Sequence, residues 1–310
     1  MKPFMNYEQQ IEKLKEKNLI ISNPDFARNM LIKYSYYSLI GGYKRLFKNP
    51  ITKNYIDGVT FEEIVAFYHF DEDLRALFLK YILPIERQLK STLSYYFCEK
   101  YGEKQSAYLD ANNFNNVPKN RNGIARLIAV LAGASGSPSN YAYINHHNLV
   151  YGNVPLWVLM NALTFGNVSA MYQYSLQTIQ AQVCKHFEYL NIKQFHQMIT
   201  VVAKCRNVCA HAERLYSFKT TDDISNTVLH KKLNIPSKGG QYTQGKRDLF
   251  AVVIALRYLL DNKDFLSFKK SLVLLLNKVE KSCTHLPKDK LMQDMGFPDN
   301  WKEITRYKLK

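Results

Sequence analysis

Hydrophobic residues recur at spacings of three and four along most of the chain, which is the period of an α-helix with one buried face. The longest run begins at Thr60, where Thr60 and Glu63 have the form of a capping box. Pro84 lies inside this run, so we expect the helix to kink or divide there. No window alternates as a strand for more than a few residues, so the sequence predicts an all-α fold. Similar spacing predicts helices over residues 7–17, 26–40, 155–175, 178–190, 194–216, 247–260 and 264–281.

Two stretches lack this periodicity. Residues 110–154 are rich in Asn, Gly, Ser and Pro and contain only a short helix-like segment, IARLIAVLAG, so we expect a long irregular connection there. Residues 217–246 predict a second loop that leads to the last two helices. Because the helices on either side of 110–154 would lack partners alone, we prefer a single domain over residues 1–310.

The composition is that of a folded, basic protein. Hydrophobic residues make up 46% of the 310 residues, which is enough for a sizeable core. The formal net charge is +16, and the chain contains 22 Tyr and 17 Phe. Cationic side chains with exposed rings suit nucleic acid, because phosphates attract Lys and Arg and bases stack on aromatic rings. A genome whose codon usage favours Lys, Asn, Tyr and Ile would produce a similar composition, so charge alone leaves this open.

The cysteines and the apolar windows indicate a reduced, cytoplasmic protein. The five cysteines include no CxxC pair, so neither a disulfide framework nor a zinc ribbon is indicated. Cys205 and Cys209 share one helix face, where packing is the favoured interpretation. The first residues lack the apolar run of a signal peptide, and windows 251–260 and 272–276 are too short to span a bilayer.

The segment 194–216 carries the residues best suited to chemistry. Its apolar positions alternate steps of three and four and form one stripe: Phe195, Met198, Val202, Cys205, Cys209, Ala212 and Tyr216. Helical projection places the polar side chains on the opposite arc: His196, Thr200, Lys204, Arg206, Asn207, His211 and Arg214. Arginine binds phosphate and histidine transfers protons near neutral pH. Any solvent-facing arc also collects such residues, so the pattern alone does not decide between catalysis and an ordinary surface.

Several ordered blocks resemble a known family. RNVCAH has the R-N-x-x-x-H form of the HEPN ribonuclease motif, and its context CAHAERLYSF is similar to the corresponding segment of the Abi-like abortive-infection family. Three further blocks of that family are matched in order by NLIISNPDFARNMLIKYSYYSLIGGYKRLF, FEEIVAFYHFDEDLRALFLKYILPIERQLKSTL and VPLWVLMNALTFGNVSAMY. The resemblance spans about residues 18–218. It departs from the family at Ala212 and Ser217, where relatives often have His and Asn.

The resemblance implies an HEPN-type helical bundle with additional helices and a metal-independent endoribonuclease acting in anti-phage abortive infection as a toxin. Two copies of the motif helix would face each other in a homodimer, so that two chains complete one site. Arg206 would hold the phosphate, Asn207 would orient groups by hydrogen bonding, and His211 would be general base or acid. Arg214, Lys204 and His196 are predicted to contact RNA. No metal and no cofactor are expected.

Two alternatives remain at this point. The same basic surface would suit a non-catalytic HEPN protein that holds a small noncoding or structured RNA, and an inhibitory small RNA is a further expected partner. A regulatory dimer that binds no nucleic acid is a third class. For Asp71, Arg75 and Glu86 we favour a buried ion-pair network that braces the long helices over contact with substrate.

Overall fold

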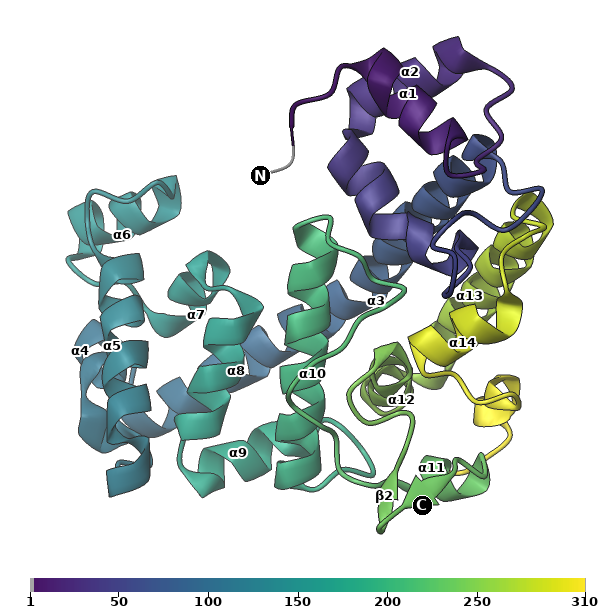
Figure 1. Ribbon diagram of the computed structural model, residues 1–310. Helices are drawn as coiled ribbons and strands as arrows, with labels where there is room; N and C mark the ends of the chain where they lie inside the picture. The colour runs from purple at the N-terminus through teal and green to yellow at the C-terminus, as the bar shows by residue number, and fades with distance from the viewer. Residues whose placement is uncertain (1–2, 310) are drawn as a thin grey trace.

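The computed structural model describes residues 3–309 and is built mainly of helices (Figure 1). The prediction of an all-α fold is confirmed. In the described part, regular strands are limited to a two-stranded antiparallel hairpin of β1 Ser237–Lys238 and β2 Gln241–Tyr242. The α-helices are α1 Tyr7–Lys15, α2 Pro24–Tyr34, α3 Phe61–Tyr101, α4 Gln105–Leu109, α5 Arg121–Ser135, α6 Ala142–Tyr151, α7 Leu156–Leu159, α8 Phe165–Tyr174, α9 Gln177–Cys184, α10 Ile192–Ala210, α11 Val228–Lys232, α12 Leu249–Leu259, α13 Asn262–Ser282 and α14 Lys288–Met295. The short π and 3-10 segments are η1 Tyr37–Gly41, η2 Lys44–Phe47, η3 Ala111–Asn113, η4 Pro118–Asn120, η5 Met160–Ala162 and η6 Trp301–Thr305.

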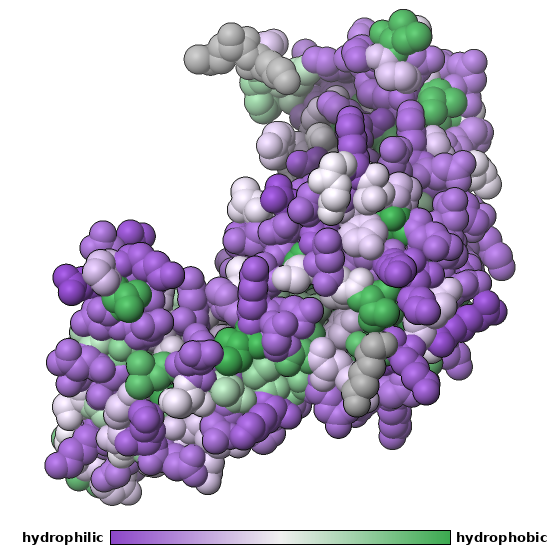
Figure 2. All heavy atoms as spheres, turned by 90° about the horizontal axis from the view of Figure 1, so that it is seen from below, coloured by the Kyte–Doolittle hydropathy of each residue, from purple (hydrophilic) through white to green (hydrophobic). Residues whose placement is uncertain are grey.

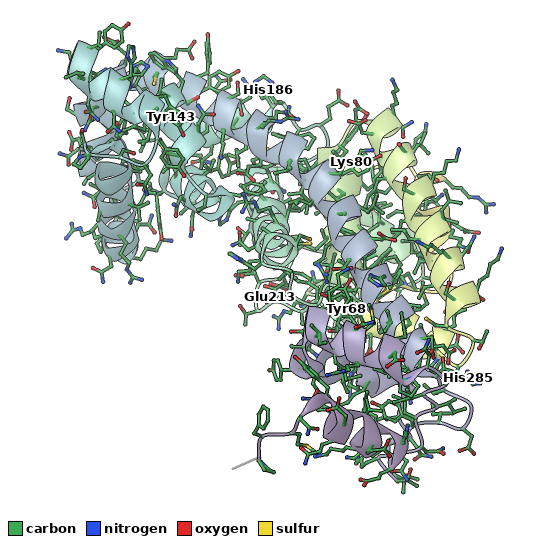
Figure 3. The ribbon with its side chains drawn as sticks, turned by 90° about the horizontal axis from the view of Figure 1, so that it is seen from above. Tyr68, Lys80, Tyr143, His186, Glu213 and His285 are labelled. Atoms are coloured by element: carbon green, nitrogen blue, oxygen red, sulfur yellow. The ribbon has the colours of Figure 1, made fainter. Side chains whose placement is uncertain are left out.

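The molecule is L-shaped, and α3 runs through both arms (Figures 1 and 3). One arm holds α4 to α9, and the other holds the N-terminal helices together with α13 and α14. Helix α10 packs against α3, α8 and α12 where the arms join. Seen from below, hydrophilic residues cover most of the surface, and hydrophobic ones are confined to small patches (Figure 2). Within residues 3–309 no helix has both the length and the apolar character needed to cross a membrane.

Helix α3 begins at the predicted capping box. The Thr60 hydroxyl accepts the Glu63 backbone N–H at 3.2 Å, and the Glu63 carboxylate accepts the Thr60 N–H at 3.1 Å. Pro84 does not divide the helix, which continues to Tyr101. The ribbon changes direction near Lys80, one turn before the proline (Figure 3). A proline removes one backbone hydrogen bond and crowds the preceding turn, so a bend at this place has an identifiable cause.

The prediction of an irregular connection over 110–154 was wrong for most of its length. Helices α5 and α6 occupy 121–135 and 142–151, and α5 packs against α4 and α8. Three of the residues that α5 buries, Ile124, Leu127 and Leu131, lie three and four apart. The helix-like segment expected here, IARLIAVLAG, lies within α5, whereas α6 was not expected. Small Gly and Ser side chains weaken a hydrophobic pattern without preventing a packed helix. The predictions also omitted α14 and η6 near the C-terminal end.

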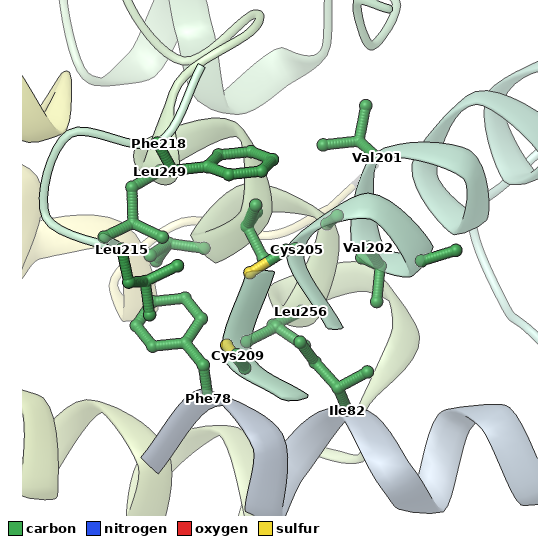
Figure 4. Close-up of a cluster of buried hydrophobic side chains, with 14 of the residues drawn as sticks. Phe78, Ile82, Val201, Val202, Cys205, Cys209, Leu215, Phe218, Leu249 and Leu256 are labelled. Atoms are coloured by element: carbon green, nitrogen blue, oxygen red, sulfur yellow. The ribbon is translucent and has the colours of Figure 1, made fainter. Parts of the chain in front are cut away.

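The apolar stripe of α10 is buried between α3 and α12 (Figure 4). Phe195, Met198, Val202 and Cys205 are fully buried, and Cys209 is 8% exposed. Cys205 and Cys209 are free thiols, and they lie in a cluster with Phe78 and Ile82 of α3 and with Leu249 and Leu256 of α12. Burial raises the pKa of the Cys205 thiol. The interpretation of these cysteines as packing residues is therefore confirmed.

The segment 217–246 is largely irregular, as expected, and a buried histidine holds it in place. The backbone N–H of Thr227 donates to Nδ1 of His230 at 3.0 Å, so Nε2 carries the proton and donates to the Gly245 carbonyl at 2.9 Å. Both ring nitrogens are thus satisfied by a neutral imidazole. Burial, opposed by the hydrogen bond to Gly245, lowers the pKa of His230 from 6.5 to about 4. A second proton, on Nδ1, would point at the backbone N–H of Thr227, so that two donors would face each other.

We therefore predict that stability falls when the solution is acidified from pH 6.5 to about 4. Between these values the unfolded chain binds more protons at His230 than the folded chain, so acid favours unfolding. A lowering of the pKa of this size corresponds to about 3 kcal/mol of folding stability at most. Urea titrations of wild type and His230→Gln at several pH values give the slope of the free energy of unfolding against pH, which should be smaller in the variant. His146→Gln, at an exposed histidine, serves as the control and should keep the wild-type slope; an unchanged slope in His230→Gln would contradict the assignment.

Candidate functional site

The helix that carries the Arg-Asn-His motif is α10, and it ends earlier than predicted. Asn191 and Gln194 form a capping box at its start, and Ala210 is its last residue, with His211 as the C-cap. The prediction of one helix over 194–216 was therefore wrong beyond residue 211. Glu213 N–H donates to the Val208 carbonyl at 3.0 Å, and Ala212 has a positive φ of 55°. This is the Schellman ending, with Ala212 in the left-handed position that usually holds glycine.

The chain leaves the helix because a buried carboxylate on α3 binds the next turn. Asp71 is fully buried, and it accepts the backbone N–H groups of Leu215 at 3.0 Å and Tyr216 at 2.7 Å. Arg75 also donates to the Glu213 carbonyl at 3.2 Å. These contacts engage the backbone groups that another helical turn would have used. Sequence periodicity could not reveal this, because the competing partners are more than 100 residues away in the chain.

Asp71 receives two further donors from side chains. The Tyr43 hydroxyl and the Arg75 guanidinium both donate to Oδ2 at 2.8 Å. Burial and the charge of Asp71 raise the pKa of Tyr43, so this hydroxyl stays protonated. Burial also raises the pKa of Asp71, whereas its four donors favour the carboxylate. Since every neighbour donates, the site is complete only with the ionised form.

Arg206 is held by a second carboxylate of α3. Its Nε lies 3.2 Å from Oε2 of Glu86, whose Oε1 lies 2.8 Å from Nζ of Lys90. The Arg206 side chain is 26% exposed, and its two terminal nitrogens form no hydrogen bond within residues 3–309. Asp71–Arg75 and Glu86–Arg206 thus form separate pairs rather than the single network expected. Both brace α3 against α10 or the turn that follows it.

His211 lines an open groove between the end of α10 and the segment around η1 Tyr37–Gly41. The groove has a volume of about 700 Å³. The His211 ring is exposed and forms no hydrogen bond to any described residue. Glu213 is the acidic residue of the groove lining. Four tyrosines and three cations also line the groove: Tyr34, Tyr37, Tyr43, Tyr68, Lys33, Arg214 and Lys219. Such a lining suits a polyanion that carries aromatic bases.

The tyrosines of this groove were not identified from the sequence as site residues. Tyr37 is 86% exposed, and Lys33 Nζ lies 4.9 Å from the Tyr34 ring centroid. Arg214 donates to the Gly42 carbonyl at 3.3 Å, and a Cβ at Gly42 would lie 3.2 Å from Cδ of Arg214. Glycine at this position lets the arginine lie against the backbone. The sequence feature that could have indicated them is the tyrosine-rich stretch YSYYSLIGGY. It was matched as part of a family block, and no function was assigned to its tyrosines.

Of the remaining predicted residues, Arg214 lines the groove with His211, whereas Asn207, Lys204 and His196 do not. Asn207 is exposed, and its carbonyl accepts the His211 N–H at 2.9 Å. Lys204 pairs with Asp222. His196 is partly buried beside Thr200, its pKa is lowered by burial, and it lies about 22 Å from His211 along an ideal helix. Arg214 lies in the turn after α10 and not on the polar face of the helix, where it was predicted.

Within one chain, the motif residues therefore lie in two separate environments, the groove and the contact with Glu86. His211 and Arg214 line the groove, whereas Arg206 lies toward Glu86 and is not part of the lining. The groove can bind phosphate through its cations and exchange a proton at the imidazole. Within residues 3–309, no three His, Cys, Asp or Glu side chains are grouped so that they could hold a metal ion.

Comparison with known families gives one match. The family model described as Abi-like protein matches residues 29–217, which is more than half of the chain. The matched region includes the tyrosine-rich segment, α3 and the motif helix. No curated protein and no solved structure matched the chain. The resemblance drawn from the sequence blocks is confirmed at the level of the family.

We predict that Asp71→Ala destabilises the protein by about 3–5 kcal/mol, because it leaves Arg75 without its buried partner and the backbone of 215–216 without an acceptor. Asp73→Ala, on the same helix, should cost less than about 1 kcal/mol, since Asp73 pairs with Lys278 at an exposed position. Urea denaturation followed by circular dichroism measures both. Equal losses in the two variants would show that Asp71 has no special role.

Proposed function

The chain belongs to the Abi-like protein family, and on that premise we propose that it is a metal-independent endoribonuclease of the HEPN type. Membership of this family points to abortive infection, a form of defence against phage. The observation that carries the proposal is the placement of His211. An exposed imidazole without a partner in the described chain lies in a groove lined by three cations and four tyrosines, five residues from a partly exposed arginine.

The groove offers the groups needed to bind a single strand of RNA. Lys33, Arg214 and Lys219 can contact phosphates, and the exposed ring of Tyr37 can stack on a base. In the proposed reaction, an imidazole removes the proton of a ribose 2′-hydroxyl. The resulting oxygen attacks the adjacent phosphorus, and the bond from phosphorus to the 5′ oxygen breaks. An acid protonates that leaving oxygen, so the products are a 2′,3′-cyclic phosphate and a 5′-hydroxyl.

One chain supplies a single His211, whereas the reaction uses a base and an acid. We propose that two chains meet about a twofold axis so that the ends of both α10 helices face one RNA strand. The second chain would bring the second imidazole and its own Arg206 to the open side of the groove. The Glu86–Arg206 pair supports this arrangement, because it fixes the arginine through Nε and leaves the terminal nitrogens for phosphate.

His211→Ala is expected to lower the rate of RNA cleavage by about 10²–10⁴-fold, the usual contribution of a general acid or base. The assay uses an end-labelled single-stranded RNA in EDTA and analyses the product ends for 2′,3′-cyclic phosphate. His146→Ala, at an exposed histidine of α6, is the matched control and should cleave at the wild-type rate.

The same assay separates this proposal from its alternative. A non-catalytic RNA-binding protein would retain RNA in a salt-sensitive manner and would show no cleavage in either wild type or variant. Cleavage by His211→Ala at the wild-type rate would remove His211 from the mechanism.

Mixed dimers test whether two chains share one site. If both imidazoles are required, mixing equal amounts of wild-type and His211→Ala chains leaves about one dimer in four with two His211 residues. Activity per total chain should then fall to about a quarter, provided the chains exchange or are co-expressed with separate tags. Independent sites would retain about half of the activity, and that result would contradict a shared site.

A further inference from the structure

A large cleft lies away from the His211 groove. It has a volume of about 980 Å³, which is within the range of small-ligand sites. Its walls come from α3 at Pro84, from the segment 186–189, from the end of α12 and from residues 305–309. In Figure 3 the labelled His186 lies beside α3, between the labels of Lys80 and Tyr143. Two of these walls lie beyond residue 217, where the family match ends.

Arg257 in this cleft is an uncompensated cation. Its Nε is buried without a hydrogen-bond partner, and within residues 3–309 no carboxylate pairs with it. Its guanidinium carbon lies 5.3 Å from the ring centroid of Phe265, and burial lowers the pKa of this arginine. The residue as a whole is partly buried, and an Nε shielded from water without an acceptor is costly, so a bound anion that accepts from this guanidinium would be favourable.

A second cation lies close to Arg257. Burial, together with the charges of Arg306 and Arg257, lowers the pKa of Lys269. Lys269 donates to the Thr305 hydroxyl at 2.7 Å, and Thr305 lines the cleft. These groups form a positive centre that favours a bound anion.

The carboxylates of the cleft do not neutralise Arg257. Glu188, Asp261 and Asp264 line the cleft, but none lies within ion-pair distance of it. Asp261 caps α13 by accepting the Asp264 N–H at 2.7 Å, and Glu188 accepts a hydrogen bond from the Tyr189 hydroxyl. The anion that would complete this site must therefore come from outside the described chain.

Aromatic rings flank the same positive centre. Tyr189 is 46% exposed and has a φ of 67°, a conformation that is rare for a bulky residue. Tyr307 lines the cleft from the C-terminal segment. A phosphate beside Arg257 and a planar ring against Tyr189 or Tyr307 are the two halves of a nucleotide.

We propose that this cleft is a mononucleotide-binding site, with Arg257 binding the phosphate, Lys269 adding positive charge behind Thr305, and the tyrosines contacting the base. It is distinct from the His211 groove and does not depend on the proposed ribonuclease activity. A bound nucleotide would also join α3, α12 and the segment 305–309. Binding would therefore stabilise the folded chain.

The test measures binding of ATP, AMP and inorganic phosphate by calorimetry and thermal unfolding on the full chain. Wild type should bind a nucleotide more tightly than phosphate, with a rise in Tm. Arg257→Met keeps the aliphatic stem and should weaken binding by about 10- to 100-fold, while its Tm without ligand stays equal to or above that of wild type. Arg28→Met, at an exposed arginine outside the cleft, should bind as wild type does.

Arg306→Met is the second variant, because Arg306 is exposed and its loss should not disturb folding. It should weaken nucleotide binding by severalfold. No nucleotide binding by wild type, or equal binding by Arg257→Met, would overturn the proposal. Binding of phosphate as tight as that of nucleotide would remove the role of the tyrosines. If a short single-stranded RNA binds through Arg257 while the mononucleotides do not, the cleft belongs to an RNA path and the mononucleotide assignment is wrong.

Discussion

The buried carboxylate of Asp71 is the constraint on which the geometry of the His211 groove depends. One side chain without access to water binds a tyrosine from the N-terminal segment, an arginine of its own helix and two backbone N–H groups beyond α10. Removing any donor would leave the charge less satisfied in a medium of low polarity. Three segments far apart in the sequence are therefore fixed relative to one another. The tyrosines and His211 meet in one groove because of that fixation.

Helix α3 acts as a common support for both halves of the motif. Asp71 and Glu86 are fifteen residues apart, close to four full turns, so they lie on similar sides of the helix about 22 Å from each other. Asp71 holds the backbone that follows His211, and Glu86 holds the side chain of Arg206. The register of α3 thus sets the positions of the arginine and the histidine separately. A shift of α3 by one residue would turn both carboxylates away from their partners.

The sequence predicted the helical class, the capped start of α3, the buried face of α10 and the family, because each depends on local spacing or on short motifs. It did not predict the end of α10. The apolar stripe continues through Ala212 to Tyr216, and Tyr216 is indeed buried, but it reaches the core from a turn and not from a helix. The position at which α10 ends is determined by long-range hydrogen bonds to Asp71. The same limit explains why Tyr34, Tyr37 and Tyr68 were not assigned to a site, since their meeting with His211 is a property of tertiary packing.

The residues after 217 complete the motif helix and are not an independent addition. Leu249 and Leu256 of α12 cover Cys205 and Cys209, and α13 packs along α3. Without them, the apolar face of α10 would be exposed to water, and helices in proteins owe most of their stability to the packing of such a face. A single domain over residues 1–310 stays a prediction, and the two parts of the described chain share this core. Arg257 also belongs to α12, so a ligand bound in its cleft would contact the helix that covers the motif cysteines.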